Sequence, residues 1–297
     1  MQNKSNKNLT TVNGGLSFLI MITVYLSVTL VGQLILMLVG VTEGFVYYVI
    51  SGLFSSISMI AVIILNAVKT KQKLVKIVNF TPVNPVYILY AIVLAIGMFF
   101  GFGFLNDALS RLFASWGLNA GGVSLSINNF IEFIVYTVVL AVLPAILEEA
   151  FFRGAMLSGL DGKAFSVSVT VGVCFAVYHG SFSQFAYQFI YGFSLCFLAI
   201  KAKSAIPSAV AHFINNFVVL LFTYLKIAID LTNLMVIVMG ICLLIVYWVS
   251  LVCYKSKKRT IEHVAGEDSV TLRQFWLPFG VCATAICSML MILSLFS

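Results

Sequence analysis

Charged residues are scarce in this chain of 297 residues. Asp, Glu, Lys and Arg together make up 9% of it, whereas hydrophobic residues make up 61%. An average soluble domain has about 25% charged residues, so this chain lacks the charge needed to cover a surface in water. The composition excludes a soluble globular protein and predicts an integral membrane protein.

Closely paired cysteines are also lacking. The six cysteines lie in or at the ends of apolar stretches, without the spacing of a zinc ribbon or a disulfide framework. We expect them to be small core residues.

Long polar tracts, linkers and repeats do not divide the chain. The longest polar loops, near 107–129 and 254–273, have about 20 residues each, which is too few for an independent domain. The sequence therefore predicts a single membrane domain over 1–297, with its functional groups inside the membrane.

Apolar stretches that could cross a bilayer are abundant. Such a helix needs about 20 apolar residues, and the sequence predicts an all-α polytopic helix bundle with about nine spans. A tight turn over 180–184 separates the fifth span from the sixth, and without the short sixth span the count would be eight. The first span is longer than the core of a signal peptide, so we expect it to be retained. The spans run approximately over 15–40, 44–68, 85–106, 132–157, 164–183, 185–200, 204–225, 231–254 and 274–296.

Basic residues are unevenly divided between the two sides that these spans define. With the N-terminus inside, only Arg111 and Lys226 of the 17 basic residues fall outside. Basic residues are retained on the cytoplasmic side of membrane proteins, so we expect a multi-pass protein of the cell membrane with a cytoplasmic N-terminus. The basic loop 255–259 has a topogenic role in this interpretation, and no nucleic-acid partner is implied.

Ionisable residues inside the spans are few. Such groups are costly in a bilayer and are candidates for function. They are Glu148 and Glu149 in the fourth span, His179 in the fifth and His212 in the seventh, with Asn216 one turn after His212. At 1.5 Å per residue, the side chains of Glu148, His179, His212 and Asn216 are placed about 13–22 Å from the cytoplasmic helix ends. Three helices thus bring a carboxylate, two imidazoles and an amide to similar depth.

The two adjacent glutamates point in different directions on a helix. Glu149 and Arg153 are four residues apart and can form a buried structural ion pair, whereas Glu148 points about 100° away. We expect Glu148 to face the histidines. The alternative is that all three charges form one packing network.

Three motifs carry a resemblance to a known family. They are Glu-Glu-x-x-x-Arg at 148–153, Phe-x-x-x-His at 175–179 and His-x-x-x-Asn at 212–216. Together, within about 130–220, they resemble the CAAX protease and bacteriocin-processing family, also called Abi, which includes the type II CAAX prenyl endopeptidases. We expect residues 130–220 to form the catalytic core, in spans four to seven.

The resemblance implies an intramembrane peptidase that acts on a membrane-associated protein or peptide. Glu148, assisted by His179, would activate a water molecule for attack on the scissile carbonyl. His212 and Asn216 would donate hydrogen bonds to the developing oxyanion.

A metal is the open alternative. Glu148, His179 and His212 offer one oxygen and two nitrogens, a donor set that zinc accepts in catalytic sites. An amide such as Asn216 is a more natural hydrogen-bond donor than a zinc ligand, which favours activation of water without metal. No other cofactor is expected.

Motifs of other intramembrane proteases are absent. The sequence contains no His-Glu-x-x-His, no Gly-x-Ser-Gly and no pair of Asp residues in two spans. A non-enzymatic alternative remains, in which the chain is a bacteriocin self-immunity protein or a membrane regulatory scaffold. The complete set of Glu148, His179, His212 and Asn216 favours the peptidase.

Overall fold

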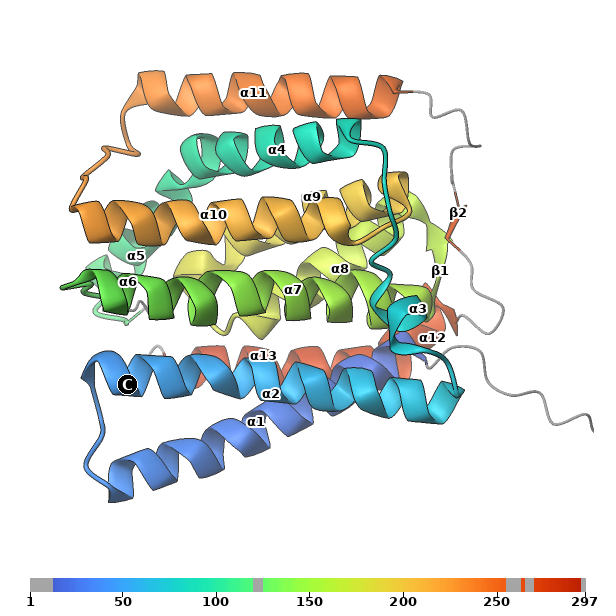
Figure 1. Ribbon diagram of the computed structural model, residues 1–297, viewed down its shortest axis with the longest axis horizontal. Helices are drawn as coiled ribbons and strands as arrows, with labels where there is room; N and C mark the ends of the chain where they lie inside the picture. The colour runs from blue at the N-terminus through green and yellow to red at the C-terminus, as the bar shows by residue number, and fades with distance from the viewer. Residues whose placement is uncertain (1–12, 120–124, 255–262, 265–269, 295–297) are drawn as a thin grey trace, which may run out of the picture.

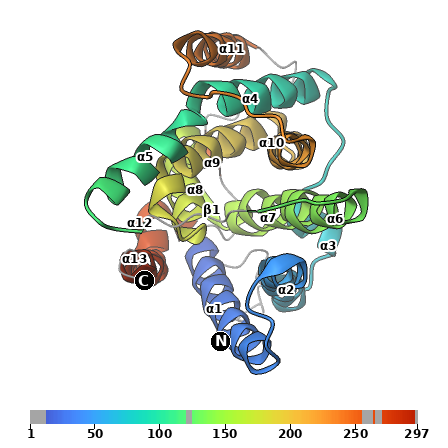
Figure 2. The same cartoon turned by 90° about the vertical axis from the view of Figure 1, so that its left-hand side faces the viewer.

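The computed structural model describes residues 13–119, 125–254, 263–264 and 270–294. Within these residues the chain forms a bundle of helices that run roughly along one direction (Figure 1). Seen along the bundle, α8 and α9 lie in the middle, α4 and α11 on one side, and α1 and α2 on the other (Figure 2). Residues 1–12 and the basic loop 255–259 lie outside the described part.

Thirteen α-helices and three π-helical segments make up most of the described chain. The first half contains α1 (Gly14–Leu38), α2 (Gly44–Thr70), α3 (Leu74–Val78), α4 (Val86–Phe102), α5 (Phe104–Ser115), α6 (Phe130–Tyr136), η1 (Thr137–Val142), α7 (Leu143–Glu149) and η2 (Ala150–Met156). The second half contains α8 (Ala164–Tyr178), α9 (Phe182–Ala202), α10 (Ile206–Leu225), α11 (Leu234–Cys253), α12 (Leu272–Phe275), η3 (Trp276–Gly280) and α13 (Val281–Ser294). The all-α helix bundle is confirmed.

Each of the nine predicted spans coincides with a helix. Seven helical segments of the described chain are long and apolar enough to cross a membrane, which makes this a multi-pass membrane protein. The other two, Ala164–Tyr178 and Val281–Ile292, are shorter apolar helices. At 1.5 Å per residue, 15 residues extend about 22 Å, which is less than the hydrocarbon thickness. Nine complete crossings therefore remain a prediction.

Two segments predicted as polar loops contain regular structure. Residues 107–115 of the first loop belong to α5, which begins at Phe104 within the third predicted span, carries Asp107 in its first turn and buries none of its residues. Residues of the second loop form β2 (His263–Val264) and β3 (Val270–Thr271). Both strands pair with β1 (Leu160–Lys163), which lies in the centre of a small three-stranded sheet. β2 is antiparallel and β3 parallel to it, and pairings this short give no period-2 pattern to recognise.

The connections between helices gather at two ends of the bundle. The α2–α3 connection, β1 and the α9–α10 connection lie at one end, on the right of Figure 1. We call this the lysine-rich end, because Lys71, Lys163 and Lys203 lie there. The α1–α2 and α10–α11 connections lie at the opposite end, with Lys226. This separation agrees with the alternation predicted from the sequence, and the cytoplasmic location of the lysine-rich end remains a prediction.

Glycines bring α4 and α11 into close contact. A Cβ atom at Gly101 would lie 2.9 Å from the carbonyl carbon of Gly240, and one at Gly97 would lie 2.9 Å from Cγ of Leu244. Small residues allow helix backbones to approach in a membrane, where apolar side chains gain little from leaving lipid. The Gly-x-x-x-Gly spacing of α4 thus has a packing role.

Candidate active site

The helix that carries the glutamates is not regular. The α-helical segment α7 lies between the π-helical segments η1 and η2. Pro144 has no N–H, so the carbonyl of Leu140, four residues earlier, cannot receive the usual α-helical hydrogen bond. The Asn216 side chain donates to this carbonyl instead, over 3.1 Å from Nδ2 to O. π-Helical turns often occur at functional sites, and here the irregularity ties α10 to the glutamate helix.

Glu149 and Arg153 form an ion pair in the centre of the bundle. Nη1 of Arg153 lies 2.9 Å from Oε1 of Glu149, and both side chains are fully buried. Nη2 of Arg153 donates to the carbonyl of Gly192 at 2.8 Å. A Cβ atom at Gly192 would lie 2.9 Å from the ring of Phe175, so only glycine leaves room for this arrangement. The pair that the i,i+4 spacing predicts is present, and it also joins η2 to α9.

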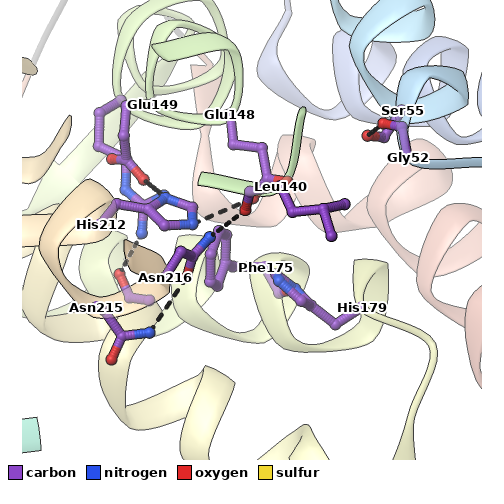
Figure 3. A network of polar contacts seen from close by, with 12 residues as sticks. Gly52, Ser55, Leu140, Glu148, Glu149, Phe175, His179, His212, Asn215 and Asn216 are labelled. Carbon is purple, nitrogen blue, oxygen red and sulfur yellow. Dashed lines mark hydrogen bonds and ion pairs between the residues drawn. The ribbon is translucent and has the colours of Figure 1, made fainter. Parts of the chain in front are cut away.

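His212 lies between the two glutamates (Figure 3). Its Nδ1 is 2.9 Å from Oε1 of Glu149, and its Nε2 is 3.9 Å from Oε2 of Glu148. The first distance is a hydrogen bond, whereas the second is an ion-pair distance without a hydrogen bond. Glu149 therefore contacts both Arg153 and the histidine. The sequence does not reveal this second contact, because no spacing along the chain connects α7 with α10.

The two glutamates differ in how their carboxylates are satisfied. Oε1 of Glu149 is shared by Arg153 and His212. Oε2 has no hydrogen-bond partner in either glutamate within the described residues, but the Glu148 carboxylate makes no hydrogen bond there through its other oxygen either, although its side chain is only 8% exposed. A buried polar atom without a partner is costly and usually has a functional or solvent-related reason. Glu148 is thus the carboxylate available for chemistry.

The ring of Phe175 lies at the centre of the three motifs. Its centroid is 4.7 Å from the guanidinium carbon of Arg153, which is a cation–π distance. The rings of His179 and His212 lie 4.5 Å and 5.8 Å from it. Phe175 therefore separates the two histidines and covers the buried arginine, which explains a phenylalanine at this position of the Phe-x-x-x-His motif.

His179 does not join the charged cluster. Its Nδ1 lies 2.8 Å from the carbonyl of Phe175, and Figure 3 shows its ring on the side away from His212. A carbonyl only accepts hydrogen bonds, so Nδ1 carries the proton and Nε2 has the free lone pair. No hydrogen bond or ion pair connects His179 with Glu148 among the described residues. Its predicted assistance to Glu148 remains a prediction.

Asn216 belongs to a chain of polar contacts that the sequence motifs do not show. The hydroxyl of Tyr187 donates to Oδ1 of Asn215 at 2.5 Å, and Nδ2 of Asn215 donates to Oδ1 of Asn216 at 3.2 Å. Asn216 in turn donates to Leu140, as described above. The amide is therefore held in place from both sides, with one N–H of Nδ2 left for another acceptor.

A cavity of about 810 Å³ leads from the end of the bundle that carries Lys226 to Asn216 and Leu140. Glu148 and His212 do not line it. His212 lies one helical turn from Asn216 toward the start of α10, away from Lys226.

The predicted zinc ligands are not grouped. Within the described part of the chain, no three side chains of His, Cys, Asp or Glu lie together so as to hold a metal ion. Glu148 and His212 approach each other, but His179 lies on the far side of Phe175. The donor set in this geometry does not fit a zinc site.

Comparison with known proteins gives a match to a family model. A family model described as Rce1-like, type II CAAX prenyl endopeptidase, matches residues 130–218, which include all three motifs. No curated protein and no solved structure matches the chain.

Proposed function

We propose that this multi-pass membrane protein hydrolyses a peptide bond with a water molecule activated by Glu148, since residues 130–218 match the family model of Rce1-like type II CAAX prenyl endopeptidases. The family implies CAAX-type endopeptidase activity, and the particular roles of the residues are our proposal. The observation that carries it is the buried cluster of Glu148, His212, Glu149 and Arg153.

Glu148 is proposed as the general base. Its carboxylate makes no hydrogen bond among the described residues, whereas Glu149 is already neutralised by Arg153. The Glu148 carboxylate would take a proton from water as the oxygen of that water attacks the scissile carbonyl. The same carboxyl would then return the proton to the leaving amine, so that protons balance over the reaction.

His212 is proposed to stabilise the negative charge that develops on the carbonyl oxygen. Nδ1 carries a proton, because it faces a carboxylate oxygen that only accepts. With both glutamates ionised and Arg153 positive, the cluster becomes neutral when His212 is an imidazolium. A neutral cluster is the least costly arrangement in a buried site, and Nε2 then also carries a proton to donate.

Glu149 is proposed as a positioning residue for His212. The 2.9 Å contact fixes the orientation of the imidazole ring, while the contact with Arg153 fixes Glu149 itself. Such chains of buried polar contacts hold catalytic groups in one geometry. The remaining N–H of Asn216 is proposed as a second donor to the oxyanion, one helical turn from His212.

The experiment that tests this function is peptide mass spectrometry of membranes that contain the wild-type protein or Glu148→Gln. The wild type should produce cleaved peptides that are absent with the variant, because the isosteric amide keeps packing but cannot act as a base. Equal peptide patterns, with both proteins present at equal level, would contradict the peptidase and favour a non-proteolytic role in immunity or regulation.

A further inference from the structure

The cavity next to the charged cluster has a particular chemical lining. Three side-chain amides from two helices face it, namely Asn106 of α5 and Gln184 and Gln188 of α9, and it ends at Asn215 and Asn216. Among the described residues that line it, Lys226 is the one that carries a charge, and none is acidic. The rest of the lining is mostly apolar, as in many ligand sites.

The side-chain amides near the entrance have donors and acceptors that are not used within the described residues. Oδ1 of Asn106 is buried without a partner in the described part of the chain. The side chains of Gln184 and Gln188 make no hydrogen bond within that part either, and they lie four residues apart on one face of α9. Each amide offers a donor and an acceptor, which is also what a peptide group offers.

We infer that this cavity binds an extended, uncharged peptide segment that enters from the end of the bundle carrying Lys226, opposite the lysine-rich end. This inference rests on the proposed peptidase function and adds the direction of entry and the class of substrate. An extended peptide in a membrane must find partners for its N–H and C=O groups, and the amides supply them.

Other occupants fit less well. An isoprenoid or acyl chain makes no hydrogen bonds, so it would leave the amides of the lining without partners. A phosphate-bearing headgroup is usually held by several cationic donors, whereas Lys226 is alone among the described lining residues. A peptide with apolar side chains matches both the amides and the apolar walls.

The position of Asn216 connects the cavity to the proposed chemistry. It is ten residues before Lys226 on α10, or about 15 Å deeper. His212 lies one turn deeper, on the side of Asn216 that faces away from Lys226. A peptide that lies along α10 from Lys226 would thus reach Asn216, the nearer of the two proposed oxyanion donors.

Cysteine accessibility tests the direction of entry without depending on activity. The variants Gln188→Cys, Asp230→Cys and Lys203→Cys would each be made in a chain whose exposed Cys242, Cys253 and Cys282 are replaced by serine, so that only buried cysteines remain beside the introduced one. Phe189→Cys is the matched control, since it neighbours Gln188 on α9 but does not line the cavity. A membrane-impermeant maleimide should label Gln188→Cys from the same side as Asp230→Cys, and Phe189→Cys should stay unlabelled.

Two results would overturn the direction of entry. One is labelling of Gln188→Cys only from the side that labels Lys203→Cys, and the other is no labelling from either side. Because neither readout requires cleavage, both can be distinguished from failure of the peptidase function, which the Glu148→Gln comparison reports.

Protection by a probe peptide tests the class of occupant. An acetylated and amidated hexapeptide of alternating alanine and leucine should slow labelling of Gln188→Cys several-fold and leave Asp230→Cys unchanged. The same hexapeptide with two glutamates should protect less, because a buried carboxylate is costly. Unchanged labelling with the uncharged peptide, or equal protection by both, would overturn the assignment of the occupant.

Discussion

The contact between α7 and α10 and the contact between α4 and α11 are both buried, but they are built from different chemistry. The first joins Glu148, Glu149 and His212 through charged and hydrogen-bonded groups. The second joins Gly101 and Gly240 through their backbones, and neither α4 nor α11 contains Asp, Glu, Lys, Arg or His. Small residues at a helix contact in a membrane serve close packing. Ionisable side chains raise the free energy of a protein in a bilayer, so their presence indicates a function. The comparison favours a catalytic role for the contact between α7 and α10 and a packing role for the contact between α4 and α11.

The largest effect, on both the melting temperature and the amount of protein, is expected for Arg153→Ala. It leaves Glu149 as a buried charge with only His212 beside it, and breaking a buried pair costs about 3–5 kcal/mol. Both the melting temperature in detergent and the amount of protein in membranes should fall. Arg111→Ala, on the exposed helix α5, is the control and should leave both unchanged. A stable but inactive Arg153→Ala protein would instead give the arginine a direct role in catalysis.

Asn216→Ala should affect turnover more than stability. Loss of one oxyanion donor lowers turnover by about a hundred- to a thousandfold, with little change in KM. Asn66→Ala removes another buried amide, which is bonded to Ser17 on α1, and should retain turnover per folded molecule. An Asn216→Ala protein with a raised KM and unchanged kcat would show that the amide serves only substrate binding.

Gly240→Val should affect stability and spare the chemistry. The added side chain would meet the backbone of Gly101, and overpacking costs about 1–3 kcal/mol. The melting temperature should fall while turnover per folded molecule stays near that of the wild type. Cys242→Val enlarges an exposed residue of the same helix and should be neutral. If Gly240→Val abolished turnover without unfolding the protein, the proposal that the contact between α4 and α11 serves only packing would be wrong.

The smallest effect is expected from metal removal. If His212 and Asn216 serve as donors, treatment with a chelator should leave turnover unchanged. Elemental analysis of purified active protein is the second readout. One zinc per chain that disappears in His212→Ala, together with reversible loss of turnover on chelation, would contradict the metal-free proposal.

The sequence predicts the helices well, because a long stretch without charges in a membrane must satisfy its backbone hydrogen bonds internally, which an α-helix does. It also predicts that Glu149 pairs with Arg153, since four residues in a helix place two side chains on one face. It does not predict the contact between Glu149 and His212, which depends on how α10 lies against α7. Nor does it predict the role of Asn215 and Tyr187, because hydrogen bonds between helices leave no periodic signal.

The irregular backbone around the glutamates is a second feature that sequence analysis missed. Pro144 is a visible signal, since it removes the hydrogen bond to Leu140. That Asn216 supplies the replacement can be known only from the packing of α10. The small sheet around β1 was missed because strands of two residues carry no alternation.

The central claim is that Glu148 is the base and Glu149 is not. The most direct measurement is turnover by purified Glu148→Gln in detergent, per folded molecule, on a peptide that the wild type cleaves. The variant should melt near the wild-type temperature, because Glu148 holds no hydrogen bond through Oε2, and it should show no turnover above background. Turnover within about tenfold of the wild type, equivalent to about 1.4 kcal/mol in the barrier, would contradict the account.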